Sequence, residues 1–216
     1  MDLPTVTALA ACPVPGSDLL ASGGFDGIVR LWDVRAPRAR ISSGTALSEK
    51  AASPGDAVTK LAFTGEAVTA ATAGGDLVVY DMRVATVGRV HVQGSPAVTG
   101  FVALDASTVL LSCHDSVLRL VEIPEGGEGG GTALPVEPMS VYEGHKACTD
   151  SDLGLHVDSS SRYVSTCSED GTVVVYDFVT GDIVQRLEES GRRMGGVEGG
   201  IVVGGRGGAR VYKLRR

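Results

Sequence analysis

Short runs of apolar residues alternate with turns rich in glycine and aspartate along almost the whole chain. The first clear unit has apolar runs near residues 5–12, 18–23 and 27–33, and Asp26-Gly27 separates the second run from the third. An Asp-Gly pair between two such runs is a strong signal for a tight β-hairpin. No stretch longer than a turn has helical periodicity, so the pattern predicts an all-β fold.

A short sequence motif, an aromatic residue followed by an acid, recurs at the end of the third predicted strand of each unit. The clear copies are Trp32-Asp33, Tyr80-Asp81 and Tyr176-Asp177, and weaker copies end at Val121-Glu122 and Tyr212-Lys213. Successive copies lie 36 to 55 residues apart. This spacing brackets the ~40–45-residue period of one four-stranded propeller blade. The repeat therefore predicts a radial all-β architecture.

We predict a single repeat domain over residues 1–216 that forms a partial or open propeller with four full blades and one partial blade. The predicted blades cover about residues 5–44, 57–93, 97–142, 151–187 and 195–214. Residues 124–132 are rich in glycine and glutamate, and this composition predicts a flexible insertion. An open arc should leave apolar residues of the first blade, Leu9, Leu20 and Ile28, uncovered.

Composition and charge argue against several classes of partner. The net charge is −7 with acids and bases interspersed, whereas a nucleic-acid-binding domain usually carries a basic stripe. No apolar run approaches the ~20 residues of a membrane-spanning helix. The N-terminal segment lacks the basic start of a signal peptide. We therefore expect protein partners, no nucleic acid, no membrane, and a cytoplasmic or nuclear location.

Residues that could carry chemistry are sparse. The four cysteines (Cys12, Cys113, Cys148 and Cys167) have no CxxC spacing, and His145-x-x-Cys148 would need two further ligands to form a zinc site. No serine lies in a nucleophile elbow, and the glycine-rich residues 204–208 lack the Lys-Ser/Thr of a phosphate-binding loop. We predict no catalytic residues, no metal, no cofactor and no enzymatic activity. Unpaired cysteines favour a reducing compartment.

The repeated units resemble the WD40 repeat family over almost the whole chain. Gly144-His145 matches the Gly-His signature of that family, and Tyr176-Asp177 matches its closing Trp-Asp pair. The resemblance implies structural roles for the closing pairs. It also implies a buried hydrogen-bond relay, whose members here would be His145, Ser165 or Thr166, Asp170, and Tyr176 in place of Trp. The other interpretation of His145 is a ligand or an acid–base group.

Two successive boxes resemble a narrower group within this family. Trp32-Asp33-Val34-Arg35 and Tyr80-Asp81-Met82-Arg83 are similar to the WDxR boxes of the DCAF proteins, the substrate receptors of cullin-RING ubiquitin ligases. Residues 141–145 and 152–158 resemble the corresponding stretch of the fourth DCAF type. The resemblance implies that Arg35 and Arg83 dock on the propeller-built DNA-damage-binding adaptor, while the opposite face selects an unknown client.

Two functional hypotheses remain open. Arginine after Trp-Asp-x also occurs in WD40 proteins without a ligase role, as a solvated strand end or an ion-pair partner. The first hypothesis, which the two boxes favour, is a ligase substrate receptor. The second is a generic WD40 scaffold in an RNA-processing, trafficking or signalling complex. Co-purification with the adaptor would distinguish the two.

Overall fold

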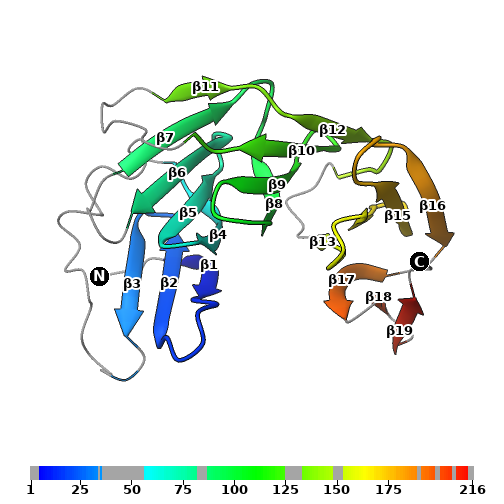
Figure 1. Cartoon of the computed structure of the whole chain (residues 1–216), viewed down its shortest axis with the longest axis horizontal. Helices are drawn as coiled ribbons and strands as arrows, with labels where there is room; N and C mark the ends of the chain where they lie inside the picture. The colour runs from blue at the N-terminus through cyan, green and yellow to red at the C-terminus, as the bar shows by residue number, and fades with distance from the viewer. Residues whose placement is uncertain are drawn as a thin grey trace.

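The chain folds into five β-sheets arranged along an arch. The computed structural model describes residues 5–33, 35, 56–81, 87–124, 133–147, 153–188, 191–197, 200–205 and 208–213. Within these residues there is no helix, and nineteen strands form the five sheets. The sheets follow one another in chain order, and the first and last lie at the two feet of the arch (Figure 1). This is the open, all-β propeller that the repeats predict.

The first two sheets are antiparallel meanders. The first contains, in order, β1 (Val6–Ala11), β2 (Leu19–Gly24) and β3 (Val29–Asp33). The outer strand predicted near residues 38–44 lies outside the described residues. The second sheet contains β4 (Val58–Thr64), β5 (Ala67–Thr72), β6 (Asp76–Asp81) and β7 (Val87–Val92). A fifth strand, β11 (Leu134–Val136), pairs with β7 in parallel, and the sequence pattern did not predict it.

The other three sheets continue the same meander. The third contains β8 (Val98–Ala103), β9 (Thr108–Cys113), β10 (Val117–Glu122) and β12 (Ser140–Glu143). The fourth contains β13 (Leu155–Val157), β14 (Tyr163–Cys167), β15 (Thr172–Asp177) and β16 (Ile183–Glu188). The fifth contains β17 (Gly191–Val197), β18 (Gly200–Gly205) and β19 (Gly208–Lys213). The fifth sheet thus begins four residues before the start expected at Gly195.

The sequence repeat corresponds to a repeat in strand register. In four sheets the closing acid pairs with the first residue of the second strand: Asp33 with Leu19, Asp81 with Ala67, Glu122 with Thr108, and Asp177 with Tyr163. Because register and direction are the same each time, every closing acid lies at the same corner of its sheet. Side chains that are far apart in sequence are therefore brought to one face of the arch.

The apolar core lies between the sheets rather than inside any one of them. Each of its four clusters draws residues from two consecutive sheets. The cluster between the first two sheets, for example, joins Ala21 and Val29 to Val68 and Tyr80. The middle strand β9 is buried on both faces, since every residue from Val109 to Cys113 is buried. Strands of this kind do not show strict apolar–polar alternation.

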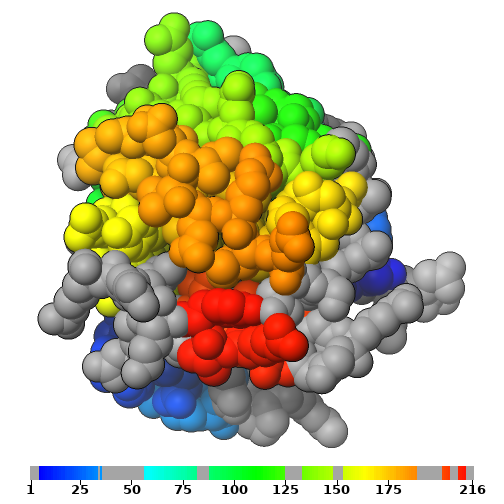
Figure 2. Space-filling model, turned by 90° about the vertical axis from the view of Figure 1, so that its right-hand side faces the viewer, coloured from blue at the N-terminus to red at the C-terminus, as the bar shows by residue number. Residues whose placement is uncertain are grey.

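The outer surfaces are less covered. Leu9 on β1 is 63% exposed, as expected for the outer face of the first sheet, whereas Leu20 and Ile28 are half-buried. On β16 both Ile183 and Val184 are exposed. Figure 2 views the arch from this end, with the orange surface of β16 and its preceding turn above the red surface of the fifth sheet. Apolar side chains therefore reach the surface on the outer face of the first sheet and on β16.

Two glycines allow the close approach of neighbouring sheets. A Cβ on Gly23 would lie 2.5 Å from Cγ1 of Val58, so β4 can pack directly on the backbone of β2. Gly75 has a φ of +84°, and a Cβ there would lie 2.5 Å from the carbonyl oxygen of Ser95. Gly75 is therefore required both by its left-handed conformation and by the adjacent backbone.

We expect Gly75→Ala to lower the free energy of unfolding by about 1–3 kcal/mol more than Gly16→Ala. Gly16 is the matched control, because its φ is +79° but nothing lies within 4 Å of its Cβ position. Both variants strain the backbone, while only the first collides with a carbonyl group. Urea unfolding of the two variants measures the difference. Equal losses would show that the Ser95 contact contributes nothing.

Candidate interaction faces

The connections between strands form two opposite faces of the arch. The closing-acid face carries the connections after the first and third strands of the sheets, and includes residues 12–18, 33, 35, 65–66, 81, 104–107, 158–162 and 177–182. The turn face carries the opposite connections, and includes residues 24–28, 73–75, 93–97, 114–116, 144–147 and 168–171. Loops held by a rigid sheet scaffold are the usual place for binding residues.

Arg35 lies at the surface of the closing-acid face, fixed by two carboxylates. Its backbone N–H donates to Oδ1 of Asp33 at 2.9 Å, and its guanidinium donates to both oxygens of Asp33 at 3.2 Å. Its Nε also lies 3.1 Å from Oδ2 of Asp18. The hydrogen bond from Arg35 holds the pKa of Asp33 below its usual value. The Arg35 side chain remains 71% exposed, so a partner can reach it.

Asp177 organises the equivalent turn of the fourth sheet. Its Oδ1 accepts hydrogen bonds from the backbone N–H groups of Val179 at 2.9 Å and Thr180 at 3.0 Å, which lower its pKa. Asp81 is half-buried at the end of β6. Arg83, the second predicted adaptor-binding residue, lies outside the described residues.

The closing aromatic residues point into the sheet stack rather than toward a partner. Trp32 Nε1 donates to Oγ of Ser22 at 2.8 Å within the first sheet. Tyr80 is 1% exposed, and burial raises the pKa of its hydroxyl. Tyr176 is fully buried and packs edge-on against Tyr142, with ring centroids 5.7 Å apart. Tyr80 and Tyr176 are interior, whereas Trp32 and the acids that follow these three aromatic residues are half-buried at the strand ends.

His145 occupies a buried position where the chain enters the fourth sheet. Its Nδ1 lies 3.1 Å from the hydroxyl of Tyr176. The flanking Lys146 N–H donates to Oγ of Ser168 at 2.9 Å, which ties this segment to the hairpin of the fourth sheet. Burial lowers the pKa of His145 to about 4, opposed by the charge of Asp115. The imidazole is therefore neutral at pH 7, which suits a structural role.

The other expected relay members are arranged differently. Asp170 is exposed, and its Oδ1 accepts hydrogen bonds from Thr172 N–H at 3.0 Å and Thr172 Oγ1 at 2.7 Å. Ser165 is buried, but its Oγ has no hydrogen-bond partner among the described residues, and neither does Nε2 of His145. Thr166 Oγ1 donates to the carbonyl of Gly154 at 3.2 Å. The structure thus joins His145 to Tyr176, while Asp170 orders its own turn.

The turn face carries a repeated ion pair that the sequence patterns above did not predict. Arg30 Nη2 lies 2.7 Å from Oδ2 of Asp26 in the first sheet, and Arg119 Nη2 lies 2.6 Å from Oδ2 of Asp115 in the third. Arg119 is only 7% exposed, and it also donates to the carbonyl of Gly94 at 2.7 Å. The sequence does contain this repeat, because the acid and the arginine have the same separation in both pairs and precede the closing acid by the same number of residues.

The second sheet has its own polar cluster, also at the turn-face end of its strands. Asp76 accepts hydrogen bonds from the guanidinium of Arg89, with Nε at 2.8 Å, and from Nδ1 of His91 at 2.6 Å. The Asp76 side chain is 10% exposed and the His91 side chain is 45% exposed. Register explains this cluster, because Asp76 pairs directly with His91 across β6 and β7. It fixes side chains at the outer edge of the second sheet.

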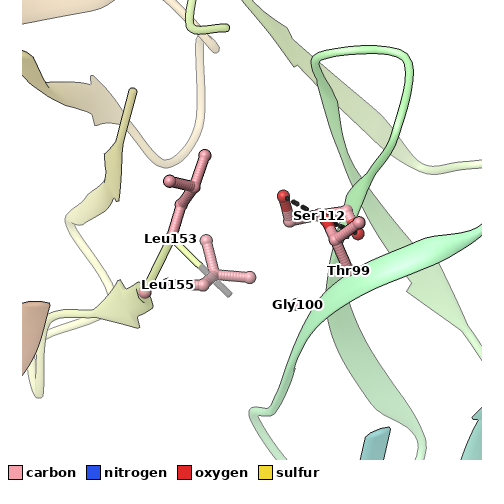
Figure 3. A pocket seen from close by; sticks show the side chains of 6 residues that line it. Thr99, Gly100, Ser112, Leu153 and Leu155 are labelled. Atoms are coloured by element: carbon pink, nitrogen blue, oxygen red, sulfur yellow. Dashed lines mark hydrogen bonds between the residues drawn. The ribbon is translucent and has the colours of Figure 1, made fainter. Parts of the chain in front are cut away.

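A shallow depression lies at the seam between the third and fourth sheets. Leu153 and Leu155 face Thr99, Gly100 and Ser112 across it (Figure 3). It leaves no room for a water-sized molecule between these side chains, in contrast to the ~300–1,000 Å³ of small-molecule sites. No group of His, Cys, Asp and Glu in the described ranges is arranged to hold a metal ion. No helix in that part of the chain could cross a membrane.

The buried histidine predicts a specific loss of stability in mild acid. The pKa of His145 is depressed in the folded state, so the unfolded chain binds a proton more tightly between pH 6.5 and about 4. Stability from this group is complete above pH 6.5 and is lost as the pH falls through that window. Relative to pH 7, we expect a loss of roughly 2 kcal/mol at pH 5.

Urea unfolding of the wild type, His145→Gln and His156→Gln at pH 7 and pH 5 tests this expectation. Burial also lowers the pKa of His156, so that variant measures the second contribution in the same window. His145→Gln should lose most of the pH dependence. An unchanged difference between the two pH values in His145→Gln would contradict a buried, neutral imidazole.

Comparison with known proteins agrees with the repeat structure. Residues 3–33 and 136–177 match the WD40 family, described as WD domain, G-beta repeat. The chain is 28% identical over 132 residues to WD repeat domain-containing protein 83 of Rattus norvegicus. The aligned region covers 61% of this chain and 38% of that protein. It is 25% identical over 196 residues to WD repeat-containing protein 82 of Drosophila melanogaster, which covers 85% of this chain and 54% of that protein.

A third similarity involves a much longer protein. The chain is 28% identical over 163 residues to Protein SPA1-RELATED 3 of Arabidopsis thaliana, which covers 73% of this chain and 17% of that protein. The chain spans about half the length, or less, of these relatives. The matched segments contain the closing pairs Trp32-Asp33 and Tyr176-Asp177, which occupy equivalent register positions in their sheets. Two segments of the chain thus match WD40 repeats, and the chain has the open, WD40-type propeller fold.

Proposed function

We propose that this WD40-repeat protein is the substrate-receptor subunit of a cullin-RING ubiquitin ligase. In this role the closing-acid face binds the ligase adaptor, and the turn face selects a client protein. WD40 repeats are protein-interaction modules, and the proposal narrows that general role to one assembly. It implies a cytoplasmic or nuclear location.

The observation that carries the proposal is the pair of WDxR boxes in consecutive repeats. Arg35 follows Asp33 at the surface end of β3, and Arg83 occupies the same sequence position after Asp81. The two acids have equivalent register positions at the same corner of neighbouring sheets. A guanidinium stays charged at all relevant pH values and makes forked contacts with carboxylates or carbonyls, which suits a docking residue.

The arrangement of Arg35 supports the proposal in one further way. The ion pairs with Asp33 and Asp18 hold the guanidinium in place before a partner arrives. A preorganised side chain loses less conformational entropy on binding than a free one. The same ion pairs also favour the second candidate, a generic WD40 scaffold, in which Arg35 only neutralises the carboxylates at the strand end.

The test is a pull-down of the DNA-damage-binding adaptor with the variant Arg35→Gln/Arg83→Gln. Glutamine is preferable to aspartate, because an acid at position 35 would face Asp18 and Asp33. We expect adaptor recovery to fall at least about tenfold, equivalent to about 1.4 kcal/mol of binding free energy. The free energy of unfolding should change by less than about 1 kcal/mol, since exposed ion pairs contribute little.

Arg162→Gln is the matched control. Arg162 lies on the same closing-acid face, but in the fourth sheet, with its guanidinium carbon 5.3 Å from the ring centre of Tyr163. This variant should retain adaptor binding. Wild-type recovery by the double variant, or no recovery by the wild type, would favour the generic scaffold.

A further inference from the structure

The outer edge of the second sheet is covered by a strand from elsewhere in the chain. After β10 of the third sheet, the chain forms β11 beside β7 and then returns to the third sheet as β12 (Figure 1). Leu134, Pro135 and Val136 pair in parallel with Val90, His91 and Val92. The N–H of Gln93 donates to the carbonyl of Val136 at 2.9 Å. The backbone of β7 thus binds an extended segment that the blade meander does not supply.

The hydrogen bond from Gln93 also explains why proline is accepted in β11. In a parallel pair, only alternate residues of a strand bond to a given neighbour. Because the backbone of Val136 is hydrogen-bonded to β7, the backbone N and C=O of the neighbouring Pro135 point away from β7. The missing N–H of proline is therefore on the solvent side, where it also prevents another strand from adding to the edge.

The two paired strands differ in how firmly they are held. Val90 and Val92 of β7 are 3% and 0% exposed and belong to the cluster between the second and third sheets. In β11, Leu134 is 47% exposed and Pro135 is exposed, and only Val136 packs against that cluster. A three-residue strand with so little buried apolar surface opens far more easily than the sheet beneath it.

We propose that the edge of β7 is a strand-acceptor site, at which an extended segment of a partner protein replaces β11. The ligand is a parallel peptide with the pattern apolar–Pro–apolar, because this is the chemistry that the site already accommodates. Backbone hydrogen bonds supply the affinity, and the position of Val136 supplies the specificity through its contact with the buried cluster. The site does not depend on the role of Arg35 or Arg83.

The proposal is tested with a fluorescent peptide of residues 132–138, Thr-Ala-Leu-Pro-Val-Glu-Pro, and fluorescence anisotropy. The receptor is the full chain with Leu134→Ser, Pro135→Gly and Val136→Ser, which weakens the internal strand. We expect this variant to bind the peptide at least about tenfold more tightly than the unaltered chain, where β11 competes. A peptide carrying Val136→Asp should bind at least about tenfold more weakly to the same variant.

Several results would overturn the proposal. One is that the folded variant does not bind the peptide, and another is that it binds both peptides equally. A third is that the unaltered chain dimerises with increasing concentration while the variant stays monomeric, because the occupant would then be β11 of a second copy.

Hydrogen exchange of the intact chain keeps the proposal testable if the variant does not fold. The amide of Gln93 should exchange at least about a hundredfold faster than that of Val79 in the interior of the same sheet. Equal protection of the two amides would mean that β11 is a permanent part of the sheet, and the proposal would fail.

Discussion

Burial of the middle strands on both faces is the constraint on which the rest of the structure depends. In β5, β9 and β15 nearly every residue is buried, so each of these sheets requires apolar neighbours on two sides. Four clusters between consecutive sheets meet this requirement. The close stacking explains why glycine occupies positions 23 and 75, where another backbone or side chain approaches within contact distance. It also explains why the closing aromatic residues Tyr80 and Tyr176 are interior.

Because packing uses the faces of the sheets, polar chemistry is confined to their ends. Aspartates at these ends have two uses. Asp33 and Asp177 accept backbone hydrogen bonds that shape the turns after the third strands. Asp26, Asp76 and Asp115 pair with arginines on the opposite face. The result, in the described residues, is two polar faces at opposite ends of the strands, and loops held on a sheet scaffold in this way suit the recognition of other proteins.

The outer strands follow a different rule, since they are covered on one side only. Apolar side chains are exposed on β16 and β11, for example Ile183 and Leu134, so these outer strands are only partly covered. At β7 the chain supplies its own cover, whereas β16 is an edge strand of the described fourth sheet. Uncovered strand edges readily add another strand, so the outer strands offer a kind of binding that the two polar faces do not.

Strand positions, hairpins and the repeat followed from the sequence, because apolar runs, Asp-Gly turns and closing pairs are local signals. The resemblance in Gly144-His145 also placed His145 near Tyr176, and Nδ1 of His145 lies 3.1 Å from the Tyr176 hydroxyl. Asp170 was expected in the same relay, yet its carboxylate orders its own turn through Thr172, and local geometry decided that outcome.

Other features depended on tertiary structure. The pairing of β11 with β7 joins residues more than forty positions apart, and no periodicity in Leu134–Val136 indicates its partner. The cluster of Asp76, Arg89 and His91 likewise exists only through register across two strands. The sequence by itself determined which segments are strands and how often they repeat. The packing of whole sheets decided which edges and side chains meet, because those contacts depend on distances that a linear pattern does not encode.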